Sequence, residues 1–201
     1  MRRWLLLSLL TLAACGHLIP ANNQTFDPAR LRSGAYRLDP EHTALLWKVN
    51  HLGFTKYVGR FDRIEGSLDF DPKSASASHL EVIVETASID SNDPKLDSDL
   101  RGSSWFDSAT YPQIVFRSTA IEVTGDHTGR VTGDLSLHGV TRPLVLDVTF
   151  NGGANDLITG RYTLGFAATG TFERSEFGID DYIPAIGDEV TLEIHAEFLK
   201  Q

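Results

Sequence analysis

The amino-acid sequence predicts an all-β protein, an antiparallel up-and-down β-barrel of about eight strands with a short helix near residues 94–101. Three observations support this fold class: seven segments alternate apolar and polar residues, turn-forming residues separate them, and small residues occur inside them. Alternation with a period of two is typical of strands that bury one face. A closed barrel also removes the unpaired edges that so many strands would otherwise expose. A two-sheet sandwich is the main alternative.

The first alternating segment has Leu45, Trp47 and Val49 on one face and Lys48 and Asn50 on the other. The remaining segments, in chain order, span residues 80–85, 114–118, 131–137, 144–150, 162–167 and 189–198. Between them, Asp-Pro, Gly-Asp and Asn-Gly-Gly sequences supply the residues that turns require. Each segment is therefore predicted to be a half-buried strand.

Small residues within the strands favour the barrel over the sandwich. Glycine inside a strand often marks a bend where a barrel turns a corner. The small residues in question are Ala44, Gly59, Gly66, Gly133, Ala168 and Gly170.

Two stretches do not fit the strand pattern. Residues 93–105 begin with Asp93-Pro94 and place Leu96 and Leu100 four residues apart, which predicts a short helix. Residues 176–188 contain Gly, Asp and Pro but are too apolar for a free loop. We expect this connection to pack against the barrel.

The N-terminus has the features of a secretory signal. Arg2 and Arg3 precede an uncharged apolar stretch, residues 4–14, which is too short to span a bilayer. Residues 1–14 are therefore predicted to be a signal peptide. The Arg pair also allows a twin-arginine signal, although no Ser or Thr precedes it.

Residues 12–15, Leu-Ala-Ala-Cys, resemble a bacterial lipobox, in which the cysteine thiol receives a diacylglycerol. Cys15 is the only cysteine in the chain, so no internal disulfide can form. We predict lipidation of Cys15, with plain secretion as the alternative, and a lipidated tether over residues 15–34. Gly16 rather than Asp follows the cysteine, which favours the outer over the inner membrane. The expected location is the periplasmic side of the cell envelope, and residues 35–200 form the predicted barrel domain.

Composition excludes some classes of function. The chain has 201 residues and a formal net charge of −9, and no stretch concentrates Lys or Arg. Nucleic-acid binding is therefore not expected. The sequence also lacks a Gly-x-Ser-x-Gly elbow, a His-Glu-x-x-His motif and a candidate cysteine nucleophile. We expect a protein that is not an enzyme and has no catalytic residues.

The apolar faces of the strands provide both the predicted core and a candidate ligand pocket. A filled and a hollow barrel use the same residue types, and eight strands enclose either a packed core or one slender ligand. The candidate pocket residues are Leu45, Trp47, Val49, Phe61, Val82, Val84, Phe116, Leu135, Leu146, Phe166 and Ile194.

Four polar residues are candidates for the rim of this pocket: His42, His51, Arg101 and Arg174. Arg174 is expected to pair with a carboxylate and so hold the short helix against the barrel mouth, with contact to a ligand head group as the alternative. His42, His51, His138 and His195 also raise the question of a metal site. The histidines lack short His-x-His spacings, so we expect no metal ligands and no cofactor.

A succession of ordered motifs covers nearly all of residues 36–199. The motifs are Tyr36-x-Leu38-Asp39-Pro40-x-His42-Thr43, Val49-x-His51-Leu52-Gly53, Gly59-x-Phe61, Asp69-Phe70-Asp71-Pro72, Leu100-Arg101-Gly102-Ser103, Trp105-Phe106-Asp107, Tyr111-Pro112-x-Ile114-x-Phe116-x-Ser118, Gly133-x-Leu135-x-Leu137-His138-Gly139-Val140-Thr141-x-Pro143-Leu144 and Arg174-Ser175-Glu176-Phe177-Gly178. In this order they resemble the YceI-like family of periplasmic lipid- or polyisoprenoid-binding proteins. The chain departs from the family pattern at Thr43, Trp47 and Glu176, where Ser, Phe and Asp are expected.

The resemblance implies a lipocalin-like barrel that binds an isoprenoid or similar apolar lipid. The protein would then bind, transport or store this lipid, held at the membrane through Cys15. The alternative is a packed structural or stress-response barrel that acts through protein partners. The bulk of Trp47 is expected to shorten or reshape the ligand channel. The sequence does not decide between a monomer and a homodimer, because no self-complementary surface is apparent in it.

Overall fold

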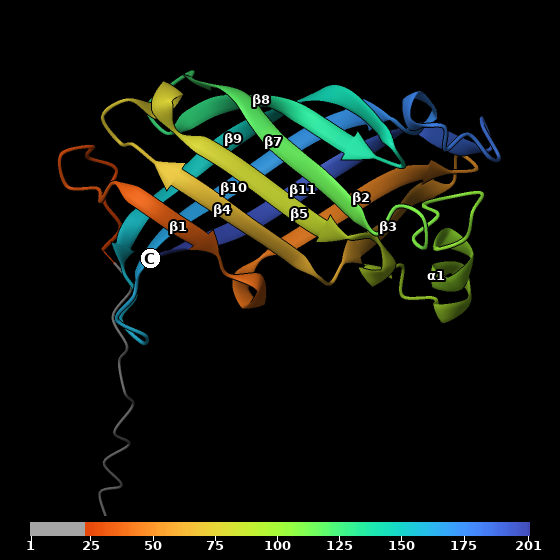
Figure 1. Ribbon diagram of the computed structural model, residues 1–201, viewed down its shortest axis with the longest axis horizontal. Coiled ribbons are helices and arrows are strands. Elements are labelled where there is room, and N and C mark those ends of the chain that lie inside the picture. The colour runs from red at the N-terminus through yellow and green to blue at the C-terminus, as the bar shows by residue number, and fades with distance from the viewer. Residues whose placement is uncertain (1–22) are drawn as a thin grey trace, which may run out of the picture.

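The computed structural model describes residues 23–201, which form an antiparallel β-barrel with one short α-helix (Figure 1). The strands, in chain order, are β1 (Gly34–Leu38), β2 (Ala44–His51), β3 (Thr55–Phe61), β4 (Ile64–Phe70), β5 (His79–Glu85), β6 (Ile89–Asp90), β7 (Gln113–Val123), β8 (Thr128–Leu137), β9 (Val140–Asn155), β10 (Tyr162–Glu173) and β11 (Ile186–Lys200). The helix α1 spans Pro94–Leu100, and four 3₁₀ turns are η1 (Pro40–His42), η2 (Ala75–Ala77), η3 (Thr86–Ser88) and η4 (Arg174–Phe177).

Eight strands close the barrel in the order β1-β4-β5-β7-β8-β9-β10-β11. Closure comes from pairing between β1 and the C-terminal end of β11, where Tyr36 lies opposite Lys200 and Leu38 opposite Phe198. The predicted fold class, a closed antiparallel barrel of about eight strands with a short helix, is confirmed. The predicted sandwich alternative is excluded because the first and last strands are hydrogen-bonded.

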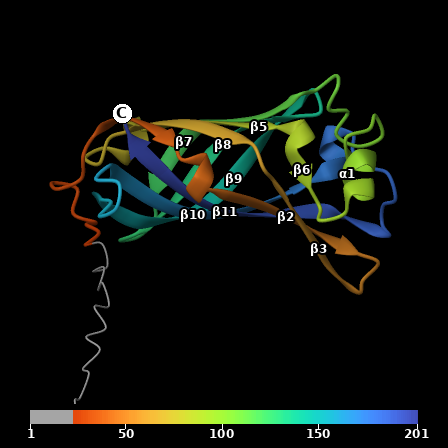
Figure 2. The ribbon, with the colours of Figure 1, turned by 90° about the horizontal axis from the view of Figure 1, so that it is seen from below.

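The remaining strands extend one wall of the barrel. The N-terminal part of β11 pairs with β2 through Ile186–His51 and His195–Ala44, and β3 and β6 follow outward. Strands β2 and β3 therefore lie between β1 and β4 in sequence, but in space β2 lies beside β11 and β3 beside β2. The turn between β2 and β3 projects beyond the barrel, near α1 (Figure 2).

The local signals explain most of the elements. Asp93 caps α1 by accepting hydrogen bonds from the Lys95 and Leu96 backbone amides, as the Asp-Pro start predicts. The apolar connection before β11 is packed, since Phe177 and Ile179 are buried. Interior glycines leave space for rings: a Cβ at Gly59 would overlap the indole of Trp47, and one at Gly133 would overlap the ring of Phe116.

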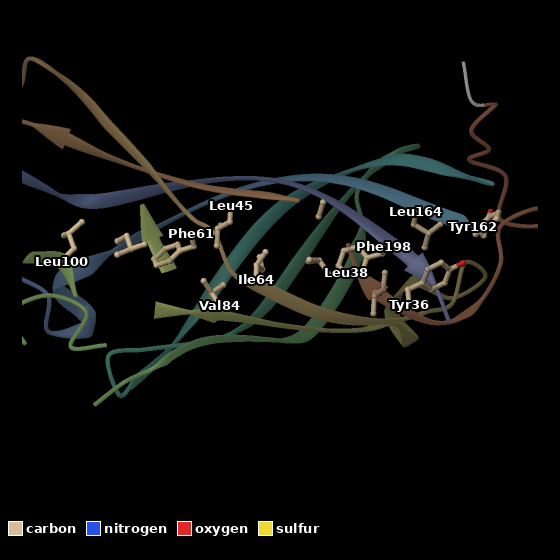
Figure 3. Close-up of a cluster of buried hydrophobic side chains, with 13 residues drawn as sticks. Tyr36, Leu38, Leu45, Phe61, Ile64, Val84, Leu100, Tyr162, Leu164 and Phe198 are labelled. Carbon is tan, nitrogen blue, oxygen red and sulfur yellow. The ribbon is translucent and has the colours of Figure 1, made fainter. Parts of the chain in front are cut away.

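The core lies inside the barrel in two clusters that together extend along its length. Figure 3 shows side chains of the first cluster in a row between opposite walls, from Leu100 near α1 to Tyr162 at the other end. The outer faces of the strands carry polar and charged residues, which gives the alternation seen in the sequence. In the part of the chain that the structure describes, no helix has the length and hydropathy needed to cross a membrane.

Candidate functional site

A cavity of about 690 Å³ occupies the inside of the barrel and is lined almost entirely by apolar side chains. All eleven predicted pocket residues lie on its wall: Leu45, Trp47, Val49, Phe61, Val82, Val84, Phe116, Leu135, Leu146, Phe166 and Ile194. The period-two alternation of the strands brings them together, since each stands on the inward face of its strand. The barrel is hollow rather than packed solid.

The two ends of the cavity differ in the residues that line them. The end near α1 is lined by His51, Tyr57, Trp105, Arg174 and Tyr182. The other end, at the turn between β7 and β8, is lined by Phe26, Leu31, Glu122, Asp126 and His127. The ionisable groups of the lining are thus confined to the two ends, and the middle is apolar.

Residues 23–33 pack against the end that lies opposite α1 (Figure 1). Thr25 exchanges backbone hydrogen bonds of 2.9 and 3.0 Å with Gly153 of β9. The Phe26 ring lies 4.0 Å from the His127 ring, and Leu31 packs against the core. The predicted tether over residues 15–34 is therefore partly docked on the barrel. Residues 15–22 of it, the predicted signal peptide and Cys15 lie outside the described residues.

Trp47, where the resemblance noted in the sequence predicts Phe, stands at the end of the cavity near α1. Its indole stacks on the Tyr57 ring with centroids 6.1 Å apart, and it occupies the space above Gly59. The indole Nε1 is buried without a hydrogen-bond partner among the described residues. The ring therefore forms part of the cavity wall on the side of β2 and β3.

Arg174, the first residue of η4, is buried at the same end, with 5% of its surface exposed. Its guanidinium donates to the carbonyl oxygens of Ile179, Asp181, Ile186 and Gly187 at 2.8–3.0 Å. Burial lowers its pKa, while the nearby acidic side chains act in the opposite direction. The predicted pairing with a carboxylate is wrong, because backbone carbonyls of the connection before β11 use these donors.

Arg174 also contacts the segment that follows α1, since its guanidinium carbon lies 5.4 Å from the centre of the Trp105 ring. Arg101, the C-cap of α1, donates to the carbonyl oxygens of Ala87 and Ile89 at 2.8 and 3.0 Å. It joins the helix to β6 and η3 and does not line the cavity. Arg174 therefore packs against the segment after α1, at Trp105, but makes no hydrogen bond to the helix. The hydrogen bonds that fix the end of α1 come from Arg101.

The acidic residues of α1 have local partners. Asp97 accepts hydrogen bonds from the backbone and hydroxyl of Ser91, and Asp99 pairs with Lys95 at 2.9 Å. Asp97 and Asp99 therefore do not form an acid–base cluster with Arg174, whose donors bind backbone carbonyls.

The two histidines predicted for the rim lie in different places: only His51 lines the cavity. His51 lines the cavity near α1, whereas His42 belongs to η1 and does not line it. His42 Nδ1 lies 2.9 Å from Asp39 Oδ2 on the outer face of the barrel. His138 Nδ1 contacts the Phe177 carbonyl at 3.0 Å, and His195 Nε2 lies 3.2 Å from Glu193. The four histidines do not converge on a common site.

A group that the sequence analysis missed lies on the outer face of the barrel. Asp39, His42 and Glu197 place one possible ligand atom each within 4.8 Å of one another. They line a groove of about 390 Å³ together with Asp156 and Arg161. Glu197 faces outward because its neighbours Ala196 and Phe198 line the barrel interior. Only β11 pairing, which is not visible in the sequence, brings Glu197 next to the Asp39–His42 motif.

The Asp39–His42 contact changes the titration of both groups. The hydrogen bond and charge of Asp39 raise the pKa of His42 above its ordinary value. Burial raises the pKa of Asp39, but hydrogen bonds from His42 and from the Glu41 backbone outweigh it, so that its pKa is lowered. The stabilisation from His42 is fully present below its unfolded-state pKa and is lost as pH rises through the raised, folded-state pKa.

Replacing Asp39 with Asn is therefore expected to lower the titration midpoint of His42, because the neutral amide no longer favours the imidazolium. Two-dimensional NMR of the His42 ring across pH 5–9 measures this midpoint directly. Asp134→Asn on the distant strand β8 is the matched control and should leave His42 unchanged. An unchanged midpoint in Asp39→Asn would mean that the contact does not set the charge of His42.

Comparison with known proteins finds relatives that are similar over the whole barrel. Residues 36–198 match the YceI-like domain. The chain is 38% identical over 168 residues to a UPF0312 protein of Pseudomonas putida, covering 83% of this chain and 86% of the relative. It is 34% identical over 172 residues to a UPF0312 protein of Vibrio cholerae, covering 85% and 89%.

Solved structures show the same fold. BcnA of Burkholderia cenocepacia superposes with a TM-score of 0.72 at 25% identity, covering 80% of this chain and 98% of that one. A polyisoprenoid binding domain from Saccharophagus degradans gives 0.62 at 12% identity, covering 85% and 100%. Because the domain match spans most of the chain and the barrel is shared, this protein belongs to the YceI-like family.

Proposed function

We propose that this protein binds an isoprenoid or similar apolar lipid inside its barrel and carries or stores it in the bacterial cell envelope. The observation that supports this most is the apolar cavity of about 690 Å³. Its volume lies within the range of about 300–1,000 Å³ that small-molecule sites occupy. The fold shared with a domain named for polyisoprenoid binding agrees with this ligand class.

The lining explains why the ligand would be a hydrocarbon chain. Burial of each methylene contributes about 0.8 kcal/mol, so a few isoprene units offset the entropic cost of association. The middle of the cavity offers no charged partner to a polar ligand, since its ionisable groups lie at the ends. The same distribution supports a binding role over catalysis, because among the described residues no acid–base pair faces the middle of the cavity.

The alternative role, a solidly packed barrel that acts through protein partners, is less consistent with a hollow interior. Natural interiors are close-packed and rarely leave voids much larger than a water molecule. A cavity of this size in a structural protein would lower stability without a compensating role. The hollow barrel therefore favours the ligand-binding proposal.

Purification of the protein from native membranes, followed by lipid extraction and mass spectrometry, tests the proposal. We expect an apolar lipid in about stoichiometric amount with the protein. The test variant is Val84→Phe, which narrows the cavity and should carry less of the same lipid. Recovery of no apolar molecule with either protein, together with no binding of added isoprenoid lipid, would contradict the proposal.

The location of the protein rests on the N-terminal sequence. We propose that residues 1–14 are removed and that Cys15 carries the lipid that holds the protein at the membrane, with the outer membrane favoured. Replacing Cys15 with Ser should release the protein from membranes or leave uncleaved precursor, because serine cannot form the thioether. Sedimentation with membranes and electrophoretic mobility measure both effects. If neither changes, the lipobox assignment is wrong and plain secretion is favoured.

A further inference from the structure

Four large apolar side chains project into water at the end of the barrel near α1. Leu52 is 53% exposed, Phe54 87%, Tyr182 69% and Ile183 36%. Leu52 and Phe54 belong to the turn between β2 and β3, and Tyr182 and Ile183 to the connection before β11. We call these four residues the apolar tip. Figure 2 shows the β2–β3 turn projecting beyond the rest of the barrel.

Hydrogen bonds join the two segments and shape both of them. The Leu52 backbone amide donates to the Ala185 carbonyl at 2.8 Å, and the Ile186 amide to the Tyr182 carbonyl at 2.8 Å. The Gly53 amide donates to Asn50 Oδ1 at 2.8 Å. Leu52 and Tyr182 both have positive φ angles, 54° and 63°, which side chains of this size rarely adopt. The fold thus holds these side chains outward in a defined arrangement.

The apolar tip is continuous with the cavity. Tyr182 is exposed and also lines the cavity, where its ring stacks on Trp105 with centroids 6.1 Å apart. His51 and Tyr57, on either side of the β2–β3 turn, line the cavity as well. Tyr182 therefore connects the exposed apolar tip to the cavity wall at this end.

We propose that the apolar tip inserts into the surface of a lipid bilayer and that lipid enters and leaves the cavity there; this inference rests on the proposed lipid binding. A hydrocarbon chain that crosses water between a membrane and a cavity loses about 0.8 kcal/mol per exposed methylene, and a dry path removes this barrier. Apolar side chains on a projecting turn can enter the boundary between head groups and acyl chains.

The charges near the apolar tip favour a neutral lipid surface. Lys56 follows the β2–β3 turn, whereas Asp180 and Asp181 precede Tyr182, so these acidic residues outnumber the basic one and an anionic surface would not be attracted. Attraction of an anionic surface is therefore not what would hold the tip in place. Insertion should persist on phosphatidylcholine vesicles and at high salt, where contacts between exposed charges are screened.

The opposite end of the barrel supplies a matched control. Ile158, in the turn between β9 and β10, is 82% exposed, similar to Phe54. The β9–β10 turn lies at the end of the barrel opposite α1 (Figure 1). The two residues thus report on the two ends of the same molecule.

The decisive experiment uses the protein in the form that the cell produces after processing. A fluorescent side chain is introduced at one end of the barrel or at the other. Phe54→Trp and Ile158→Trp are prepared, and each is mixed with phosphatidylcholine vesicles that contain brominated acyl chains. Bromine quenches indole emission only at close range, and the unsubstituted protein provides the baseline from Trp47 and Trp105. We expect quenching of the added emission in Phe54→Trp but not in Ile158→Trp, at low and at high salt.

A second pair of variants tests the lipid path. Phe54→Ser should slow the transfer of a fluorescent isoprenoid from vesicles to the protein by about tenfold, because one large apolar side chain no longer enters the bilayer. Ile158→Ser should transfer lipid at the unsubstituted rate. Both positions are exposed, so neither substitution disturbs the core, and thermal unfolding verifies this.

Each outcome decides the inference. Quenching of Ile158→Trp alone, or of both variants to the same extent, overturns it. Quenching of neither variant also overturns it, and that result would assign the tip to a protein partner or a second copy of this chain. Equal transfer rates in Phe54→Ser and Ile158→Ser also overturn it. If the protein carries lipid but the tip is not quenched, only this inference fails. If no lipid is carried or transferred, the proposed function fails, whatever the quenching shows.

Discussion

Replacement of Arg174 by methionine is expected to lower the free energy of unfolding by about 3 kcal/mol. The guanidinium donates to four carbonyl oxygens in the connection before β11, and the side chain is buried. Methionine fills a similar volume but leaves these acceptors without donors in a site that water reaches poorly. Chemical denaturation with a two-state analysis measures the change.

Arg142→Met is the matched control for Arg174→Met. Arg142 lies on the exposed face of β9, and its side chain donates only to the neighbouring Thr141 carbonyl at 3.2 Å. Its replacement should change the unfolding free energy by less than about 0.5 kcal/mol. If the two substitutions had equal effects, the buried carbonyl contacts would not be the source of the stability. In Arg174→Met, the loss of these hydrogen bonds should also make the connection before β11 more mobile. Faster hydrogen exchange of its backbone amides would detect this.

Replacement of Val84 by phenylalanine is expected to leave the barrel folded and to weaken lipid binding at least about tenfold. Val84 is 4% exposed, stands on the inner face of β5 and lines the cavity. In a hollow barrel the larger ring occupies empty volume, so the unfolding free energy should fall by less than about 1 kcal/mol. In a packed core the same substitution costs about 1–3 kcal/mol.

Thermal unfolding and a titration with an isoprenoid lipid measure both effects on Val84→Phe. Val145→Phe is the control, since Val145 is 44% exposed on the outer face of β9. It should change neither quantity. A stability loss of about 2 kcal/mol in Val84→Phe with unaltered lipid affinity would contradict the hollow barrel and the location of the lipid within it.

The comparison of sequence and structure shows where prediction from local pattern succeeds. Alternation predicted the strands and their inward faces. Leu45, Val84, Phe166 and Ile194 were assigned to those faces, and all four line the cavity. The face of a strand on which a residue stands depends only on its position along the chain. Helix α1 was predictable for the same reason, because the Asp93 cap and the Leu96–Leu100 spacing are local features.

Contacts between segments distant in sequence were not predictable in this way. Arg174 was expected to pair with a carboxylate, but its donors meet carbonyls that only the course of the chain before β11 brings near. Phe26 and Leu31 were assigned to a tether, yet they line one end of the cavity. Apolar residues in the predicted tether were a signal that could have suggested docking.

By itself the sequence determined the all-β class, the strands that alternate and the inward-facing side chains, because all of these follow from a period of two along the chain. Only the tertiary structure decided that the barrel is closed by β1 and β11, that it is hollow, and that Phe54 and Tyr182 share one exposed tip. Closure and cavity volume depend on how the strands are staggered around the barrel and on the summed volume of side chains from every wall. No single segment contains that information, so it appears only when the segments are assembled.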